Sequence, residues 1–260
     1  MIRLHRADRT LRVGSLVLGA EPRIVAVVAA PDVAASARRA REQGAHLVEV
    51  RLDRDPDLTP ERAVKSLRAA RAAAGLPLVA TIRLASELGE WRRSDDERLP
   101  IFAAAAAEAE LVDVELAARG LRERVVALAA QHGHAAIVSH HDVRGTPSET
   151  TLAALAAEAV EDVGAAVFKV CPTAAGPLDV ARLLSFVQAF RDRHETAQIV
   201  GMALGPEGSI SRIMGPVFGS CMTYGFVEGE APAAPGQLPI RVLRAHYDGA
   251  SFEPGLERNV

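Results

Sequence analysis

The stretch AAVFKVCP (165–172) has the pattern of a short buried β-strand with one charged residue at its centre. It follows Gly164 and ends at Pro172, and most of its residues are apolar. Lys169 is unusual there, because a lysine is rarely fully buried without an anionic partner or a lowered pKa. A lysine with a lowered pKa is a nucleophile that forms Schiff bases with carbonyl compounds. The alternative is a lysine at the strand end whose ammonium reaches water.

Seven further apolar runs of similar length occur in the chain, separated by alanine-rich amphipathic segments. The eight runs span residues 24–30, 46–53, 77–84, 111–117, 135–142, 165–172, 198–205 and 221–228. The intervals between them leave room for one helix each. Helix signals fall in these intervals: Thr59 and Pro60 precede one segment and Gly75 follows it. Asp32 and Gly44 bracket another in the same way.

Eight strand–helix units in 260 residues predict an α/β fold, a (β/α)8 TIM barrel that occupies residues 1–260 as a single domain. Two short β-like runs within residues 1–20 predict an N-terminal β-hairpin that closes the bottom of the barrel. Residues 228–236, rich in proline, glycine and alanine, predict a lid loop over the active site, and residues 249–260 a C-terminal tail. An open doubly wound sheet is the alternative, but no G-x-G-x-x-G follows the first strand.

Composition and charge limit the classes of protein to which the chain can belong. A hydrophobic fraction of 49% excludes disorder of the whole chain, and a net charge of -3 gives no sign of a nucleic-acid or membrane partner. We find no apolar stretch of membrane-spanning length and no signal-peptide core at the N-terminus. Cys171 and Cys221 lie in apolar runs without metal-ligand spacing, although the sequence leaves a disulfide open. We therefore expect a cytoplasmic protein.

Polar residues of one parity recur inside the predicted strands, and in a barrel alternate strand residues face the interior. Strand by strand they are Glu49, Arg51 and Asp53; Thr81 and Arg83; Asp113 and Glu115; His141; and Lys169. They lie toward the C-terminal ends of the strands, where the active sites of these barrels form. Five neighbouring strands thus predict one polar site, in which Glu49, Asp113 and Glu115 balance the cations.

Two adjacent histidines, His140 and His141, cannot both face the barrel interior, so one of them points toward the helices. A single histidine in a strand is more often a packed core residue than a catalyst. Here, however, one of the pair lies one strand away from Lys169. Glu87, four residues after Arg83, is either a solvated loop residue or a carboxylate that orients the inward histidine.

Several motifs taken together resemble the type I 3-dehydroquinate dehydratase family of the shikimate pathway. They are VEVRLD, ATIR with a following Glu87, VDVEL, SHHD, FKV, GPEGSISRI with a following FGS, and APGQ. The match runs in order from about residue 24 to residue 247. The resemblance implies a (β/α)8 barrel, usually a homodimer, that needs no metal and no cofactor. It also implies that 3-dehydroquinate is the small-molecule substrate, converted to 3-dehydroshikimate and water.

The resemblance further implies roles for individual residues. Lys169 would form the Schiff base, His141 would be the general acid and base, and Glu87 would pair with His141. The implied substrate-binding residues are Glu49, Arg51, Arg83, Met202, Arg212 (for the substrate carboxylate), Tyr224 (an aromatic wall where phenylalanine is commoner), Ala233 and Gln237. Two positions depart from the family pattern. Leu204 replaces a methionine, and Ala233 replaces a serine, so that one hydroxyl contact with the substrate is missing.

Other classes of function stay open on the residues alone. A class I aldolase also forms a lysine imine on a barrel, although such enzymes mostly take phosphorylated substrates. A metal-dependent hydrolase would use His141 and Asp142, but the first strand lacks an HxH pair. A non-catalytic binding protein on the same barrel would not need Lys169, His141 and Glu87 together. The residues do not separate a biosynthetic role from quinate catabolism.

Overall fold

A computed structural model describes residues 10–248 of the chain. Two strands form a separate antiparallel hairpin, β1 (Leu11–Val13) and β2 (Leu16–Leu18). The main sheet contains β3 (Arg23–Ala29), β4 (Leu47–Arg51), β5 (Leu78–Thr81), β6 (Leu111–Glu115), β7 (Ala135–Asp142), β8 (Val167–Pro172), β9 (Gln198–Gly201), β10 (Met222–Phe226) and β11 (Leu238–Pro239). The helices are α1 (Val33–Glu42), α2 (Pro60–Ala74), α3 (Asp95–Ala106), α4 (Arg122–Gln131), α5 (Glu149–Ala157), α6 (Pro177–Arg193), α7 (Ser211–Phe218) and α8 (Ile240–Asp248).

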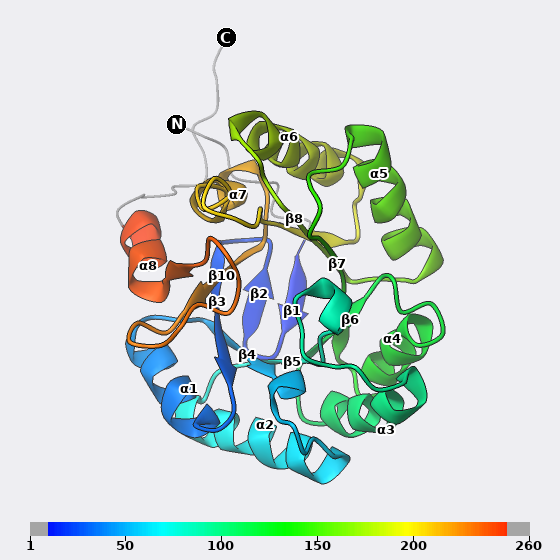
Figure 1. The fold of residues 1–260 in the computed structure, drawn as a ribbon, viewed down its shortest axis with the longest axis vertical. Coiled ribbons are helices and arrows are strands. Elements are labelled where there is room, and N and C mark those ends of the chain that lie inside the picture. Colours follow the sequence, from blue (N-terminus) through cyan, green and yellow to red (C-terminus); the bar gives the residue numbers. More distant parts are fainter. Residues whose placement is uncertain (1–9, 249–260) are drawn as a thin grey trace.

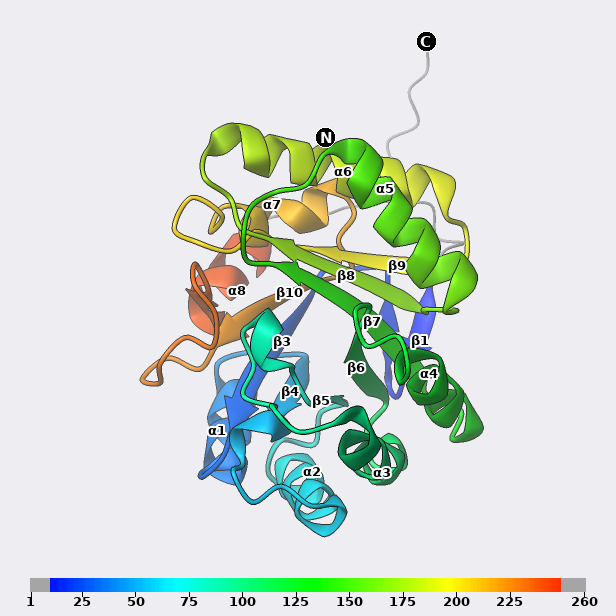
Figure 2. The ribbon, with the colours of Figure 1, turned by 45° about the vertical axis from the view of Figure 1, so that its right-hand side comes forward.

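The main sheet curls into a closed barrel. Its strands are parallel and follow the order β11-β10-β3-β4-β5-β6-β7-β8-β9, while the helices lie around them (Figures 1 and 2). Across the remaining seam, the Cys221 N–H donates to the Ile199 carbonyl at 2.8 Å. The Gly201 N–H donates to Ser220 Oγ at 3.2 Å at the same seam. Strands β3 to β10 therefore form the predicted (β/α)8 barrel, and the short β11 pairs with the end of β10.

Each of the eight predicted runs contains a strand, but several strands end before the run does. Residues 52–54 form a 3₁₀ turn, η1 (Leu52–Arg54), instead of continuing β4. Residues 82–84 leave β5 and lead into a second turn, η2 (Ala85–Glu87). These segments carry polar side chains at the mouth of the barrel, where the chain bends away from its neighbours and the ladder hydrogen bonds stop. The C-terminal ends of these strands could not be predicted from the apolar composition of the runs.

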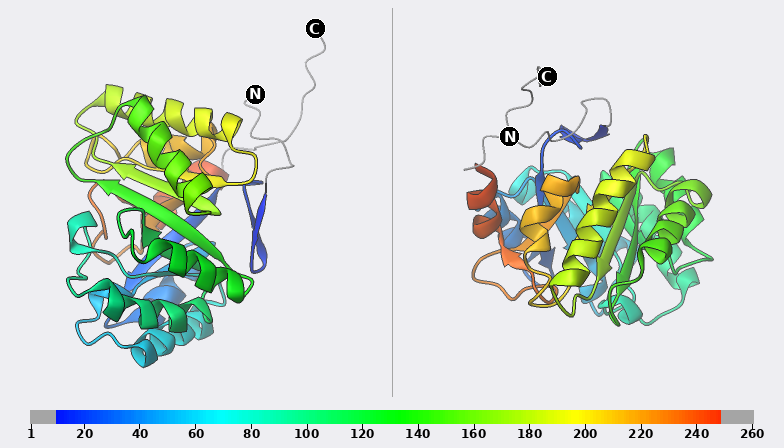
Figure 3. Two further views of the ribbon diagram at one scale, coloured as in Figure 1. Left: turned by 90° about the vertical axis from the view of Figure 1, so that its right-hand side faces the viewer. Right: turned by 90° about the horizontal axis from the view of Figure 1, so that it is seen from above.

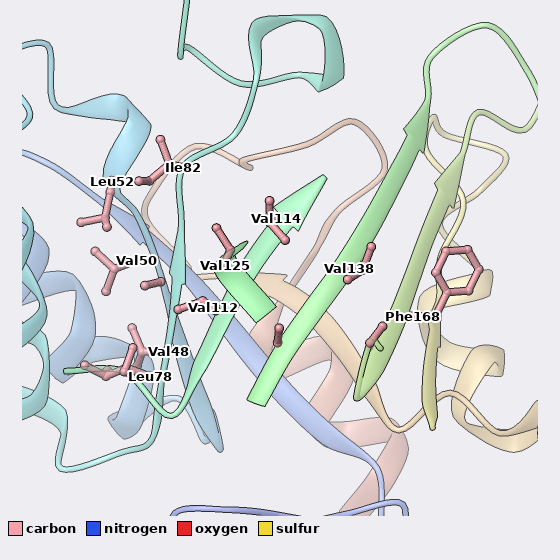
Figure 4. Close-up of a cluster of buried hydrophobic side chains, with 14 of the residues drawn as sticks. Val48, Val50, Leu52, Leu78, Ile82, Val112, Val114, Val125, Val138 and Phe168 are labelled. Atoms are coloured by element: carbon pink, nitrogen blue, oxygen red, sulfur yellow. The ribbon is translucent and has the colours of Figure 1, made fainter. Parts of the chain in front are cut away.

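The barrel strands bury both of their faces, as parallel strands covered by helices do. On the outer face, Val48 and Val50 of β4 and Val112 and Val114 of β6 belong to the core beneath the helices (Figure 4). On the inner face, apolar side chains fill the lower barrel: Val25, Leu47, Val79, Leu111, Ile137, Val167 and Val200. The inward polar residues follow two positions later along the strands, so this apolar layer is the floor beneath them.

The hairpin closes the bottom of the barrel, as predicted. It stands across the end of the barrel from which β7 and β8 point away (Figure 3). Leu11 lies opposite Leu18, and Gly14, with φ of 56°, takes the first turn position, where a left-handed residue suits a two-residue hairpin loop. Val13 and Leu18 are buried against the apolar floor. The part of the predicted hairpin in residues 1–9 lies outside the described residues.

Most predicted helix boundaries are correct. Thr59 caps α2 by accepting from the Arg62 N–H, and Gly75 ends the helix in the left-handed conformation. Gly44 follows the C-terminus of α1 with φ of 95°. Asp32 occupies the N-cap position of α1, as predicted, but its side chain makes no capping hydrogen bond.

None of the helices between residues 10 and 248 combines the length and the apolar character that crossing a membrane requires. The predicted C-terminal tail, residues 249–260, lies outside the described residues. Residues 228–236 form the loop between β10 and β11, which is the position expected of the predicted lid.

The hairpin should contribute measurably to stability. Leu18 is fully buried, so Leu18→Ala removes buried methyl groups and leaves a cavity that costs about 2–5 kcal/mol of unfolding free energy. Leu178, which is 80% exposed in α6, is the matched control, and Leu178→Ala should change the unfolding free energy by less than about 0.5 kcal/mol. Urea unfolding of both variants measures the difference. Equal effects would mean that the hairpin does not seal the core.

Candidate active site

A cavity opens at the C-terminal ends of the barrel strands, above the apolar floor. The empty space within it, open solvent included, is about 480 Å³. Its lining consists of Val27, Glu49, Arg51, Arg83, Glu87, Leu88, His141, Lys169, Cys171, Met202, Leu204, Arg212, Tyr224, Ala233, Ala234 and Gln237. Every catalytic and substrate-binding residue predicted from the sequence belongs to this set.

Lys169 lies at the centre of the cavity wall, in the middle of β8, and its side chain is 5% exposed. Its Nζ donates to Asp113 Oδ2 at 2.9 Å and lies 3.5 Å from Glu49 Oε1. Burial lowers the pKa of Lys169, but Asp113 and Glu49 outweigh it, so the pKa is raised above 10.5. The buried lysine has therefore paired with anions. Burial therefore does not make Lys169 neutral in this structure.

Asp113 on β6 connects the lysine to its neighbouring strands. Its Oδ1 accepts from Ser139 Oγ at 2.6 Å and from Arg83 Nη2 at 2.8 Å. Burial raises the pKa of Asp113, yet Arg83 and Lys169 together hold that pKa well below 3.8. Asp113 is therefore a fixed negative charge. Ser139 was not predicted as a site residue, although it has the same strand parity as His141.

His141 and Glu87 form a second buried pair. Glu87 Oε2 lies 3.0 Å from His141 Nδ1 and also accepts the His141 backbone N–H at 2.9 Å. Burial and the cations Arg83 and Lys169 hold the pKa of His141 well below 6.5, so the ring is neutral. Burial raises the pKa of Glu87 to about 7, although Arg83 opposes this. His140, by contrast, is absent from the cavity lining, which agrees with the strand parity.

Contact of Nδ1 with Glu87 leaves the other ring nitrogen, Nε2, without a partner among residues 10–248. When Glu87 is ionised it accepts a hydrogen bond from the Nδ1–H of His141, which fixes the tautomer whose Nε2 carries a lone pair. Such a nitrogen is a general base. When the pair binds one more proton, whichever atom carries it, the lone pair on Nε2 is lost.

The arginines of the cavity differ in their partners. Arg51 makes a two-pronged ion pair with Asp53, with Nε–Oδ1 at 2.9 Å and Nη2–Oδ2 at 2.8 Å. Arg212 is 2% exposed and has no carboxylate partner within residues 10–248; its Nε donates to the Gly236 carbonyl at 3.0 Å. Burial accordingly lowers the pKa of Arg212. Arg212 is thus the buried cation whose charge is left for an anionic ligand.

The predicted lid loop touches the cavity through its C-terminal half. The Ala233 N–H donates to Gln237 Oε1 at 2.7 Å, and the Gly205 N–H donates to the Pro235 carbonyl at 3.2 Å. Because the Gln237 oxygen is occupied, its amide NH₂ is the end left to donate to a ligand. A Cβ at Gly236 would lie 2.1 Å from the Gly205 carbonyl oxygen, so only glycine fits there.

One predicted charge is shared between the site and the helix layer. Glu115 was expected to help balance the cations of the site, and its Oε2 also pairs with Arg98 of α3 at 2.7 Å. Its Oε1 accepts the Leu84 N–H at 2.8 Å and lies 3.4 Å from Arg83. Glu115 is therefore shared with the helix layer and does not line the cavity. Across residues 10–248, no group of three His, Cys, Asp or Glu side chains is arranged to hold a metal ion.

Comparison with known proteins gives a consistent result. A family model described as type I 3-dehydroquinase matches residues 24–251. A 3-dehydroquinate dehydratase of Methanosarcina acetivorans is 33% identical over 233 residues, covering 88% of this chain and 95% of that protein. One of Klebsiella pneumoniae is 31% identical, covering 80% and 83%. The crystal structure of 3-dehydroquinate dehydratase from Geobacillus kaustophilus matches with a TM-score of 0.83 at 28% identity, covering 92% and 95%.

The unpaired charge of Arg212 can be tested with a carboxylate ligand. A small cyclic hydroxycarboxylate such as quinate, added at a hundred times its Kd, should stabilise the wild type by about 2.7 kcal/mol. Arg212→Met should lose most of this gain because the anion then has no buried partner. Arg38→Met, at an exposed position in α1, should keep it. Thermal unfolding with and without quinate measures the shifts, and equal gains in both variants would contradict the anion site.

Proposed function

The chain belongs to the type I 3-dehydroquinase family, and on this premise we propose that it dehydrates 3-dehydroquinate to 3-dehydroshikimate through an imine on Lys169. The observation that carries the proposal is the cavity in which the Lys169 amine and the neutral His141 imidazole lie on neighbouring strands. An amine and a base on one cavity wall are the groups that an imine-assisted elimination requires.

Binding orients the substrate before the chemistry begins. Arg212 takes the substrate carboxylate, because it is the arginine of the cavity lining that lacks a carboxylate partner within residues 10–248. The Gln237 amide donates to a substrate oxygen from the lid side. Arg51 and Arg83 are already paired with Asp53 and Asp113, so their charge is largely balanced. They act as hydrogen-bond donors with fixed positions.

Imine formation then uses Lys169. The ammonium loses a proton, the free amine adds to the C3 ketone, and the resulting carbinolamine loses water to give a protonated imine. Asp113 is a poor acceptor of the first proton because its pKa is held low, and Glu49 Oε1 lies 3.5 Å from Nζ, where it can accept that proton. The iminium nitrogen carries the same charge at the same place as the original ammonium. The carboxylates that stabilise the ammonium therefore also stabilise the iminium.

His141 completes the elimination. Its Nε2 removes a proton from the carbon next to the iminium, and the electron pair of the broken C–H bond moves into the enamine. The enamine expels the β-hydroxyl group, which takes the proton back from His141 and leaves as water. Hydrolysis of the conjugated iminium releases the enone and restores the Lys169 amine. Glu87 stabilises the transient imidazolium through Nδ1.

The charge balance of the cavity disfavours the rival functions. An aldolase with a phosphorylated substrate needs cations for a dianion, whereas the cavity leaves one unpaired arginine, Arg212, among residues 10–248. A binding protein has no need for a base placed beside a buried lysine. The sequence also predicts a role in the shikimate pathway, a cytoplasmic location and a homodimer, and these stay predictions.

Borohydride trapping tests the imine directly. The chain has two lysines, and the other one, Lys65, is exposed in α2. Reduction in the presence of 3-dehydroquinate should attach one ligand to Lys169 and abolish activity. Peptide mass analysis locates the adduct, and Lys65→Arg should trap to the same extent as the wild type. An adduct on Lys65, or no adduct in an active enzyme, would rule out the imine on Lys169.

The His141–Glu87 pair predicts the pH dependence. Since the Glu87 pKa is about 7, the pair takes up a proton as the pH falls through 7 and the lone pair on Nε2 is lost. The kcat/KM value should therefore fall tenfold per pH unit below about pH 7.

Glu87→Gln tests this assignment, because it leaves His141 to titrate alone. The acidic limb should then move to below pH 6.5, since burial and neighbouring cations depress the His141 pKa. The plateau should also fall, because the imidazolium loses its counter-ion. His140→Ala should leave the limb where it is in the wild type. Rate profiles of the three proteins decide, and an unmoved limb in Glu87→Gln would contradict the pair.

A further inference from the structure

The hydroxyl group of Tyr224 is buried without a partner in the cavity wall. Tyr224 lies in β10, is 3% exposed, and its Oη has no hydrogen-bond partner within residues 10–248. A buried phenol normally finds one, because an unsatisfied hydroxyl loses its hydration without compensation. The partner of this hydroxyl is therefore expected from outside the chain.

The second tyrosine of the chain gives the contrast. Tyr247 in α8 is also largely buried, and its Oη donates to the Arg212 carbonyl at 2.7 Å. The fold thus satisfies the phenol that lies between elements and leaves unsatisfied the one that lines the cavity. Packing alone does not require a hydroxyl on Tyr224, since phenylalanine would fill the same space.

The ring of Tyr224 lies beside the reacting nitrogen. Lys169 Nζ lies 4.2 Å from the centre of the Tyr224 ring. A molecule bonded to Nζ would therefore lie beside this ring, whose para substituent is the hydroxyl. Ala233, whose methyl group cannot donate a hydrogen bond, lines the same cavity.

The neighbouring charges determine what the hydroxyl can do. Burial raises the pKa of Tyr224 well above 10, and the carboxylates Glu49 and Asp113 raise it further. The phenol therefore stays protonated and is a donor. The same carboxylates repel an anionic acceptor, so the fitting acceptor is a neutral oxygen.

We propose that Tyr224 donates a hydrogen bond to a ring hydroxyl oxygen of the bound substrate and so supplies the contact that Ala233 cannot make. The proposal rests on the proposed function for the identity of the substrate, a cyclic polyhydroxylated ketone. It assigns Tyr224 a role in binding that a phenylalanine at this position does not have.

Tyr224→Phe keeps the ring beside Lys169 and removes only the donor. A lost neutral hydrogen bond should raise KM for 3-dehydroquinate about 2- to 13-fold, with kcat changed less than twofold. The Kd for quinate, which keeps the ring hydroxyls but has no ketone, should rise by a similar factor in titration calorimetry. The ligand-free variant should unfold at the same or a higher temperature, because a buried unsatisfied hydroxyl has gone.

Tyr247→Phe is the matched control, and it should lower the unfolding temperature because a formed hydrogen bond is lost. Unchanged KM and Kd in Tyr224→Phe would overturn the proposal, and so would a loss of stability like that of Tyr247→Phe. A wild type that binds quinate but does not convert 3-dehydroquinate would contradict the proposed function instead. The two Kd values would then still decide for or against the Tyr224 contact.

Discussion

A buried ammonium requires fixed negative charge nearby, and Lys169 has two such partners in Asp113 and Glu49. Asp113 is itself held by Arg83, just after β5, and by Ser139 of β7, so the network includes β4, β6, β7 and β8. A shift of one residue in any of these strands would turn its polar group toward the helices and leave a charge unpaired. The charges thus fix the register of half the barrel.

The same balance of charges indicates which ligand would fit the cavity. Each cation near Lys169 has a carboxylate partner, and Arg212, in the helix that connects β9 to β10, has only carbonyl and sulfur contacts among the described residues. The site therefore contains one position for an anion and another for a cation formed from a neutral carbonyl. A ketone that carries a single carboxylate matches both.

Much of this arrangement follows from the sequence, because strand residues alternate between two faces. Strand parity alone brings Glu49, Asp113 and Lys169 together, and the family resemblance adds Arg212 and Gln237 from loop and helix positions. Parity could not reveal that Glu115 turns to Arg98, because that choice depends on a helix packed behind the strand. Nor could it give the charge state of Lys169, which depends on atomic distances. Ser139 was not predicted as a site residue because a serine in a strand carries no charge that would distinguish it.

Among residues 10–248, the hairpin closes the bottom of the barrel and the cavity opens at the opposite end, beside the C-terminal ends of the strands. Val13 and Leu18 seal the floor, so nothing passes through the barrel from below. In the proposed reaction, the substrate and the water of hydrolysis enter through the opening beside the 228–236 loop. The water released with the imine and the water eliminated from the ring leave through the same opening. Substrate and product must therefore enter and leave the cavity one after the other. A product molecule that has not departed bars the next substrate, so inhibition by the product is competitive.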